Sequence, residues 1–205
     1  MSPPLYLASA SPRRRELMEA IGLAFGVRPV AIDESPHEGE SPASVAVRLA
    51  AAKAAAAAAA LRDEGIAALV LAADTVVALD GTIFGKPRDG ADALAMLKRL
   101  AGATHEVITA CRLVRGDDGR VAASVTQTRV RFRRWDPRVA SWYAATGEPL
   151  DKAGAYGIHG RGVFLSEGIE GSWSNVVGLP LEALPALFRD VGDDLYARME
   201  GAERG

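Results

Sequence analysis

Short apolar segments alternate along the chain with longer segments that mix charged and apolar residues, as strands alternate with helices in α/β proteins. We expect strands at residues 5–8, 25–30 and 69–79, and two long strands around the "DDG" turn within residues 104–135. Helices are expected at residues 12–21, 42–62, 89–101 and 137–147, with a terminal helix from 181 to about 199. This order predicts the α/β class.

End signals support these boundaries. Ser11 and Ser41 each precede a proline, and serine is a favoured N-cap while proline is tolerated at the first helical position. Three expected helices are followed by a glycine, namely Gly22, Gly65 and Gly102. The "DG" pair at 80–81 predicts a hairpin turn. Since no repeat or linker interrupts the pattern, we expect a single domain over residues 1–205 with a polar tail from about residue 200.

Composition and charge exclude several classes of partner. A formal net charge of −2 is not the basic footprint of a nucleic-acid-binding protein, so we expect no nucleic-acid partner. The alanine-rich run at 50–61 is too short and too weakly hydrophobic to span a bilayer, so we expect no membrane partner. Cys111 is the one cysteine, which excludes an intrachain disulfide and fits a core position in a reducing compartment. Without a recognisable leader, we expect a cytoplasmic protein.

The stretch "LASASPRRRE" at residues 7–16 places three arginines at the start of an expected helix. A helix N-terminus carries about half a unit of positive charge, so basic residues are disfavoured there. Either an anion binds between the free N–H groups and Arg13, Arg14 and Arg15, or these side chains point into solvent. The strand before the turn favours the anion, because ligands of α/β folds bind at the carboxyl end of the sheet. Arg14→Ala is expected to leave stability flat or slightly higher.

Two acidic residues are candidates for metal or base chemistry. Asp74 follows the apolar run "LVLAA", at what we expect to be the end of a strand, where an unpaired carboxylate is costly to bury. It is either a turn cap, or a metal ligand or general base. Glu34 lies in another loop that follows a strand, and two converging carboxylates suit Mg²⁺.

Three lysines supply complementary charge. Lys53, within the alanine-rich run, is either a solubilising surface residue or an anion ligand. Lys86 is held between a glycine and a proline, and Lys152, in a glycine-rich loop, could reach a phosphate. The sequence contains no Walker P-loop, no G-x-S-x-G, no H-E-x-x-H and no CxxC pair. Cations, two carboxylates and glycine loops together predict a phosphate-handling site.

Eight short motifs, in order and register, resemble the Maf family of nucleoside triphosphate pyrophosphatases over residues 5–187. They are "LASASPRRREL", "DE" at 33–34, "RLAAAKA", "ADTVV", "GKPRD", "THEVITA", "TGEPLDKAGAYGIHGRG" and "IEGSWSNVVGLPL". The resemblance implies a mixed, twisted α/β sheet with two lobes around a nucleotide cleft, distantly like the inosine triphosphate pyrophosphatases. It also implies hydrolysis of a nucleoside triphosphate to the monophosphate and pyrophosphate, a divalent metal (Mg²⁺ or Mn²⁺) and a homodimer.

The resemblance also assigns roles to residues of this chain. Asp74 matches the proposed general base, which would position water for attack on the α-phosphorus, and it would bind metal together with Glu34. The triphosphate would lie on the helix N-terminus, with charge supplied by a set of side chains from separate motifs: Ser9, Ser11, Arg14, Lys53, Lys86 and Lys152.

Base preference rests on fewer positions. Arg13, Thr75 and the loop "DKAGAYGI" resemble the branch of the family that acts on dTTP and UTP, not the branch that acts on 7-methyl-GTP. His159 departs from that branch, which has glutamine there. Imidazole has one donor and one acceptor on a rigid ring, so His159 either alters base discrimination or is a tolerated loop variant.

Two other functions remain open at this stage. The family's link to septum formation allows a regulator of cell division that binds nucleotide without turnover. The carboxylate at position 74 argues against such a binder, because an acid repels a polyphosphate. A triphosphatase that releases orthophosphate from the γ position is distinguished from a pyrophosphatase only by the resemblance.

Overall fold

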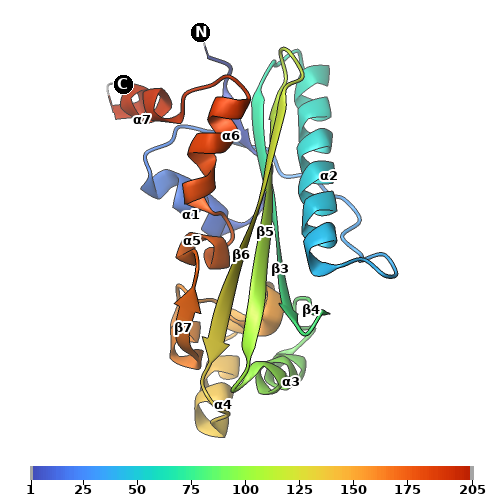
Figure 1. Cartoon of the computed structure of the whole chain (residues 1–205), viewed down its shortest axis with the longest axis vertical. Coiled ribbons are helices and arrows are strands. Elements are labelled where there is room, and N and C mark those ends of the chain that lie inside the picture. Colours follow the sequence, from blue (N-terminus) through green and yellow to red (C-terminus); the bar gives the residue numbers. More distant parts are fainter. Residues whose placement is uncertain (1, 204–205) are drawn as a thin grey trace.

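The structure is a computed structural model that describes residues 2–203. One mixed sheet of seven strands runs through the molecule in the order β2-β1-β3-β5-β6-β7, with β4 paired to β3 beside this path (Figure 1). β1 pairs in parallel with β2 and β3, and the remaining pairs are antiparallel. The strands are β1 (Leu5–Leu7), β2 (Gly26–Val27), β3 (Leu69–Leu79), β4 (Thr82–Phe84), β5 (Thr104–Arg115), β6 (Val121–Phe132) and β7 (Ser166–Glu170).

Helices cover both faces of this sheet (Figure 1). α2 lies along one face, over β3 and β5, while α1, α5 and α6 lie on the other, and α3 and α4 pack at the end opposite the β5–β6 turn. The α-helices are α1 (Pro12–Ala20), α2 (Pro42–Asp63), α3 (Gly90–Leu100), α4 (Pro137–Ala145), α5 (Trp173–Val177), α6 (Leu184–Asp190) and α7 (Leu195–Glu203). Short 3₁₀ turns are η1 (Glu148–Asp151), η2 (Ala153–Ala155), η3 (Arg161–Leu165) and η4 (Leu181–Ala183). The predicted α/β class, with a mixed sheet and flanking helices, is confirmed.

Most of the residues predicted to begin a helix or to form a hairpin turn have that role in the structure. Ser41 Oγ accepts the Ser44 N–H at 3.2 Å at the start of α2, as predicted. Asp89, expected to be the first residue of its helix, is instead the N-cap of α3 and accepts the Asp92 N–H. The turn between β3 and β4 has positive φ at both Asp80 and Gly81, the backbone that a two-residue hairpin of this type requires.

β3 divides its side chains between the two faces of the sheet. Leu69 and Leu71 belong to the core beneath α1 and α6, whereas Val70 and Ala72 pack against α2. This alternation continues along the strand, and residues 74 and 75 therefore point to opposite faces.

The C-terminal region differs from the prediction of one helix over 181–199. The segment forms η4, α6 and α7, and the chain breaks between the two α-helices at Gly192, which has a φ of +71°. Glycine adopts this positive φ without strain, whereas L side chains rarely do, so the turn favours glycine. α7 continues to Glu203, beyond the helix end expected at about residue 199.

α2 extends beyond the alanine-rich run on both sides, and by length and composition alone its 22 residues could cross a membrane. In the structure its inner face packs on β3 and β5, with Val45, Leu49 and Leu61 buried. Core helices of folded domains pass the same test, so this is weak evidence for a membrane span.

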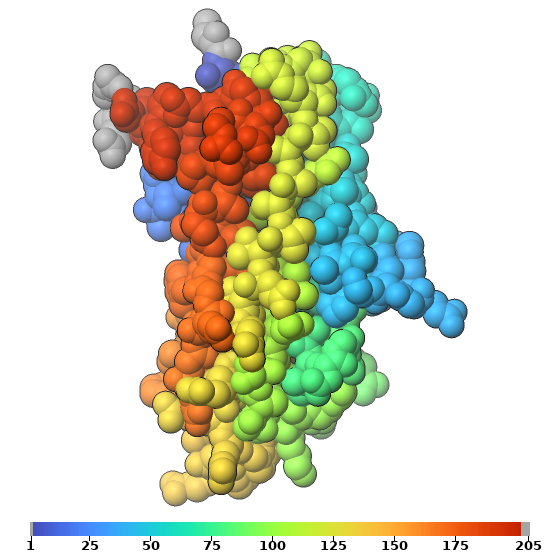
Figure 2. All heavy atoms as spheres, in the orientation of Figure 1, coloured from blue at the N-terminus to red at the C-terminus, as the bar shows by residue number. Residues whose placement is uncertain are grey.

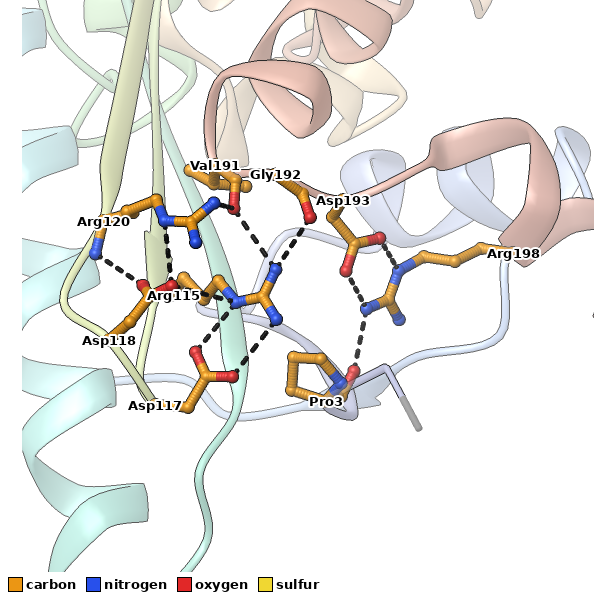
Figure 3. Close-up of polar contacts among 9 residues, drawn as sticks. All are labelled: Pro3, Arg115, Asp117, Asp118, Arg120, Val191, Gly192, Asp193 and Arg198. Carbon is orange, nitrogen blue, oxygen red and sulfur yellow. Dashed lines mark hydrogen bonds and ion pairs between the residues drawn. The ribbon is translucent and has the colours of Figure 1, made fainter.

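A polar cluster holds the C-terminal segment against the β5–β6 turn (Figure 3). Arg115 Nη1 donates to the carbonyls of Val191 and Gly192, at 3.3 and 2.9 Å, where the end of α6 carries partial negative charge. Arg198 pairs with Asp193 at 2.6 Å. These contacts lie at the end of the sheet opposite α3 and α4 (Figure 1) and stabilise the path of α6 and α7.

His105 makes the stability of this fold dependent on pH. Its ring is fully buried on β5, Nε2 lies 2.8 Å from the Tyr156 hydroxyl, and Nδ1 has no partner among the described residues. Burial lowers the pKa of His105 from 6.5 to about 4. Between these values the unfolded chain binds more protons than the folded one, so stability falls as pH falls, by about 2–3 kcal/mol at pH 4.5.

Denaturant titrations at about pH 7.5 and pH 4.5, on the wild type and on His105→Gln, measure this contribution. The variant is expected to lose less stability than the wild type between the two conditions. Equal losses would show that His105 does not carry the dependence.

Candidate active site

The candidate site lies where one edge of β3 is left open. β5 pairs with the other edge from Leu69 to Ala78. On the open edge, β1 pairs with β3 only as far as Leu71, and the pairing of β3 with β4 starts at Val77. Asp74 therefore lies in the middle of a strand and not at its end as predicted, because the antiparallel partner β5 carries β3 onward. It does lie just past the carboxyl end of β1, where the sheet is interrupted.

A cavity of about 610 Å³ fills this gap. Segments far apart in sequence line it: the β1–α1 turn, the inner face of α2, β3, the segment after β4, and the glycine-rich loop of η1 and η2. All the residues that the sequence singled out for chemistry are among its lining: Ser9, Ser11, Arg13, Arg14, Glu34, Lys53, Asp74, Thr75, Lys86, Lys152 and His159. Their individual roles stay predictions, but their convergence is a structural fact.

The β1–α1 turn delivers the N-terminus of α1 to the cavity. Ser11 occupies the N-cap position as predicted, but its side chain makes no capping bond. Ser9 Oγ instead accepts the Ser11 N–H at 3.1 Å. The first turn of α1 thus presents backbone N–H groups and serine hydroxyls to the cavity, an arrangement suited to anions.

The three arginines of α1 have three different environments. Arg15 is exposed and pairs with Glu19 on the same helix. Arg13 pairs with Asp151, which also lines the cavity. Arg14 is buried, and burial lowers the pKa of its guanidinium, an effect that the charge of Asp74 partly offsets.

Arg14 is a structural residue as well as a cavity residue. Its Nε donates to the Gly178 carbonyl at 2.7 Å, Nη1 to Ser9 Oγ at 3.2 Å, and Nη2 to Thr75 Oγ1 at 3.0 Å. These bonds join α1, β3 and the turn after α5. The expectation that Arg14→Ala leaves stability flat is therefore wrong: the side chain is inside the protein, where lost hydrogen bonds outweigh relief of the helix dipole.

A lysine joins the two predicted carboxylates. Lys53 Nζ lies 2.6 Å from Asp74 Oδ1 and 2.6 Å from Glu34 Oε1. The interpretation of Lys53 as a solubilising surface residue is wrong, since its side chain is 11% exposed on the inner face of α2. Glu34 comes from the exposed loop before α2, which projects from the body of the molecule (Figure 2).

The pKa values of the two carboxylates are shifted in opposite directions, although both groups contact Lys53. Burial raises the pKa of Asp74 above its usual value, and the charge and hydrogen bond of Lys53 offset this only partly. At the more exposed Glu34 the same burial effect is outweighed by Lys53, Lys86 and Arg14, so its pKa lies below the usual value. A carboxylate with a raised pKa next to one that stays ionised is suited to accept a proton.

The remaining predicted residues lie on the walls of the cavity. Lys86 is exposed. Lys152 Nζ donates to the Glu148 carbonyl and to Asp151 Oδ1, each at 2.8 Å. His159 is exposed, and its pKa is lowered first by partial burial and then by the nearby charges of Arg13 and Lys152.

Sequence reasoning missed several contributors to this site. Asp151 was passed over although it precedes Lys152 in a quoted motif. Thr109 on β5 lies behind Thr75, with 2.9 Å between their hydroxyl oxygens, and donates to the Asn175 carbonyl. Gly178 offers Arg14 a backbone carbonyl, for which the sequence holds no signal.

The donor set fits a divalent metal. Lys53 engages Oδ1 of Asp74 and Oε1 of Glu34, and each carboxylate has a second oxygen that can bind a cation. Within residues 2–203 no group of three or more His, Cys, Asp or Glu side chains forms a ready metal cage. Two carboxylates that leave room for water and phosphate oxygens match the coordination habits of Mg²⁺.

The fold and the site together define an α/β protein with a cation-rich cavity built around a helix N-terminus, a class suited to polyphosphate esters. The chain belongs to the Maf family, whose model, described as "Maf-like protein", matches residues 4–191. It is 51% identical to the dTTP/UTP pyrophosphatase of Myxococcus xanthus (strain DK1622) over 92% of each chain. It is 49% identical to the dTTP/UTP pyrophosphatase of Moorella thermoacetica over 95% of this chain and 98% of the relative.

Proposed function

We propose that this protein hydrolyses dTTP and UTP to the monophosphate and pyrophosphate. The observation that carries the proposal is Lys53, which holds Asp74 and Glu34 together at the open edge of β3, inside a cavity that the N-terminus of α1 enters. The names of the half-identical relatives support the same substrates.

In the proposed reaction Asp74 acts as the general base. Lys53 fixes its Oδ1, and the other oxygen has two lone pairs, one free for a cation and one to accept a proton from water as that water attacks the α-phosphorus. Ser9 and the first turn of α1 bind phosphate oxygens. Arg14 uses three of its five N–H donors within the protein and has two for the substrate. Lys86, on the rim, stabilises charge on the departing pyrophosphate.

We also propose that Glu34 and Asp74 hold a divalent cation, Mg²⁺ or Mn²⁺. Bound there, the cation would supply Lewis-acid stabilisation of charge on the phosphate oxygens. Removal of divalent cations with a chelator is expected to abolish turnover, and added Mg²⁺ or Mn²⁺ is expected to restore it. Full turnover in chelator would contradict this part of the proposal.

Incubation of the purified protein with UTP, dTTP, CTP, ATP and GTP, followed by separation of the products, tests the activity. UMP or dTMP with pyrophosphate is the expected outcome. Release of orthophosphate with UDP would identify a γ-phosphatase instead. Tight nucleotide binding without any product would favour a non-catalytic regulator.

Assembly and location complete the proposal. We infer a homodimer, for which exposed aromatic side chains on α4, η3 and α5 (Trp142, Phe164 and Trp173) offer an apolar surface. Light scattering tests the dimer, and a monomeric mass at micromolar concentration would contradict it. We infer a cytoplasmic location, consistent with the buried thiol of Cys111, and cell fractionation tests it.

His159 is expected to influence discrimination among pyrimidine nucleotides. Protonation turns its acceptor nitrogen into a second donor, and its pKa lies below 6.5, so the change is expected at lower pH than for a free imidazole. The ratios of kcat/KM for UTP, dTTP and CTP are to be compared between the wild type and His159→Gln, at about pH 7.5 and pH 5. Identical ratios in both proteins and at both pH values would identify His159 as a tolerated loop residue.

A further inference from the structure

One wall of the cavity carries a carboxylate between two cations. Arg13 Nη1 lies 2.7 Å from Asp151 Oδ2, and Arg13 Nη2 lies 3.3 Å from the Asp151 carbonyl oxygen. On the other side Lys152 Nζ lies 2.8 Å from Asp151 Oδ1. All three residues line the cavity. The Arg13 and Lys152 side chains are mostly buried, at 19% and 10% exposure, whereas Asp151 is 58% exposed.

This wall is anchored by the residues behind it. Lys152 Nζ also donates to the Glu148 carbonyl at 2.8 Å. A Cβ at Gly157 would come within 2.5 Å of Lys152 Cε, so the glycine leaves the space in which the lysine lies. Tyr143 fixes the same loop, because its hydroxyl donates to Glu148 and accepts the Gly157 N–H, both at 3.0 Å. The three polar groups are therefore held in a defined order.

The order of these groups is donor, acceptor, donor. Each has capacity left for a ligand: a guanidinium has five N–H donors, an ammonium has three, and each carboxylate oxygen has two lone pairs. The imide edge of uracil or thymine is a carbonyl, an N–H and a second carbonyl, which is the complementary order. Cytosine presents an amino group, a bare ring nitrogen and a carbonyl, so two of its three groups oppose the wall.

We propose that Asp151, held between Arg13 and Lys152, determines base specificity by accepting a hydrogen bond from the imide N–H of uracil or thymine. This inference rests on the proposed function. The proposal places Lys152 at the base and not at the triphosphate, where the resemblance would put it. Arg13 acts on one base carbonyl, and Asp151 keeps its guanidinium in position.

The electrostatics of the wall are consistent with this role. Burial would raise the pKa of Asp151, but hydrogen bonds from Arg13 and Lys152 outweigh it and lower the pKa to about 2. The carboxylate is therefore an acceptor only under ordinary conditions and cannot donate to the ring nitrogen of cytosine. Arg13 and Lys152 also lower the pKa of His159, which places that ring beside the same wall.

The test is the ratio of kcat/KM for UTP to kcat/KM for CTP in the wild type and in Asp151→Asn. A carboxamide keeps the shape but can turn its NH₂ toward cytosine, so the ratio is expected to fall by about tenfold or more, equivalent to about 1.4 kcal/mol. Glu19→Gln is the matched control. This substitution also neutralises a carboxylate that pairs with an arginine of α1, Arg15, but neither residue lines the cavity. The variant should therefore keep the wild-type ratio.

The outcomes separate this inference from the proposed function. A wild type that turns over no UTP would overturn both. A wild type that hydrolyses UTP and CTP equally, or an Asp151→Asn variant that keeps the wild-type ratio, would overturn the inference alone. A merely structural role would slow both nucleotides together and leave the ratio unchanged. If the variant is too slow to assay, calorimetric Kd values for the α,β-methylene analogues of UTP and CTP give the same ratio.

Discussion

Replacement of Asp74 by asparagine is expected to lower kcat for UTP hydrolysis by about a hundredfold to ten-thousandfold, the usual contribution of a general base. The amide keeps the shape of the side chain and can still accept from Lys53 Nζ through its carbonyl oxygen. It cannot take a proton from water. Because burial raises the pKa of Asp74, the wild-type rate should fall as the pH drops through that pKa, and the variant should lack this acid limb.

Asp80→Asn is the matched control for this substitution. Asp80 directly follows the same strand, in the turn to β4, at a positive φ that asparagine tolerates, and it is not part of the cavity lining. It should retain wild-type kcat, and both variants should keep a cooperative thermal transition. Wild-type kcat in Asp74→Asn would remove Asp74 from the mechanism.

Arg14→Ala is expected to destabilise the protein as well as to impair turnover. The substitution removes three hydrogen bonds that join α1, β3 and the turn after α5. Loss of a buried, charged donor of this kind costs about 2–4 kcal/mol, which in a chain of this size lowers Tm by about 5–15 °C. kcat/KM should fall at least tenfold, because the triphosphate loses a cation.

The neighbouring residue supplies the control. Arg15 belongs to the same helix turn but is exposed in a surface ion pair with Glu19, so Arg15→Ala should leave the thermal midpoint close to that of the wild type. Thermal unfolding of both variants, beside their kinetics, makes the comparison. An Arg14→Ala protein as stable as Arg15→Ala would contradict the buried position of Arg14.

The regular elements could be predicted from the sequence because their signals are local. Serine–proline pairs mark the starts of α1 and α2, a glycine follows each of α1, α2 and α3, and a "DG" turn marks the β3–β4 hairpin. The single terminal helix was a wrong prediction, because the chain turns at Gly192, where the backbone carbonyl accepts a hydrogen bond from Arg115 of β5. Such a contact lies far away in the sequence.

The chemistry of the site could be predicted only in part, for the same reason. Asp74, Glu34 and Lys53 were each recognised as candidates. That the lysine bridges the two acids could not be predicted, because its place in an alanine-rich helix does not indicate which residues face it. Asp151 stands in the sequence beside Lys152, yet its significance comes from Arg13, which approaches from the other end of the chain. Burial of Arg14 is likewise set by the turn at Gly178.

Hydrolysis of UTP in ¹⁸O-labelled water tests the central claim most directly, since it reports which phosphorus the Asp74-activated water attacks. The account predicts one ¹⁸O atom per turnover in UMP and unlabelled pyrophosphate, as measured by mass spectrometry of the separated products. Label in pyrophosphate would mean attack at the β-phosphorus, and label in orthophosphate with UDP as the second product would mean attack at the γ-phosphorus. Either result would contradict the proposed placement of Asp74, Lys53 and the N-terminus of α1 around the α-phosphate.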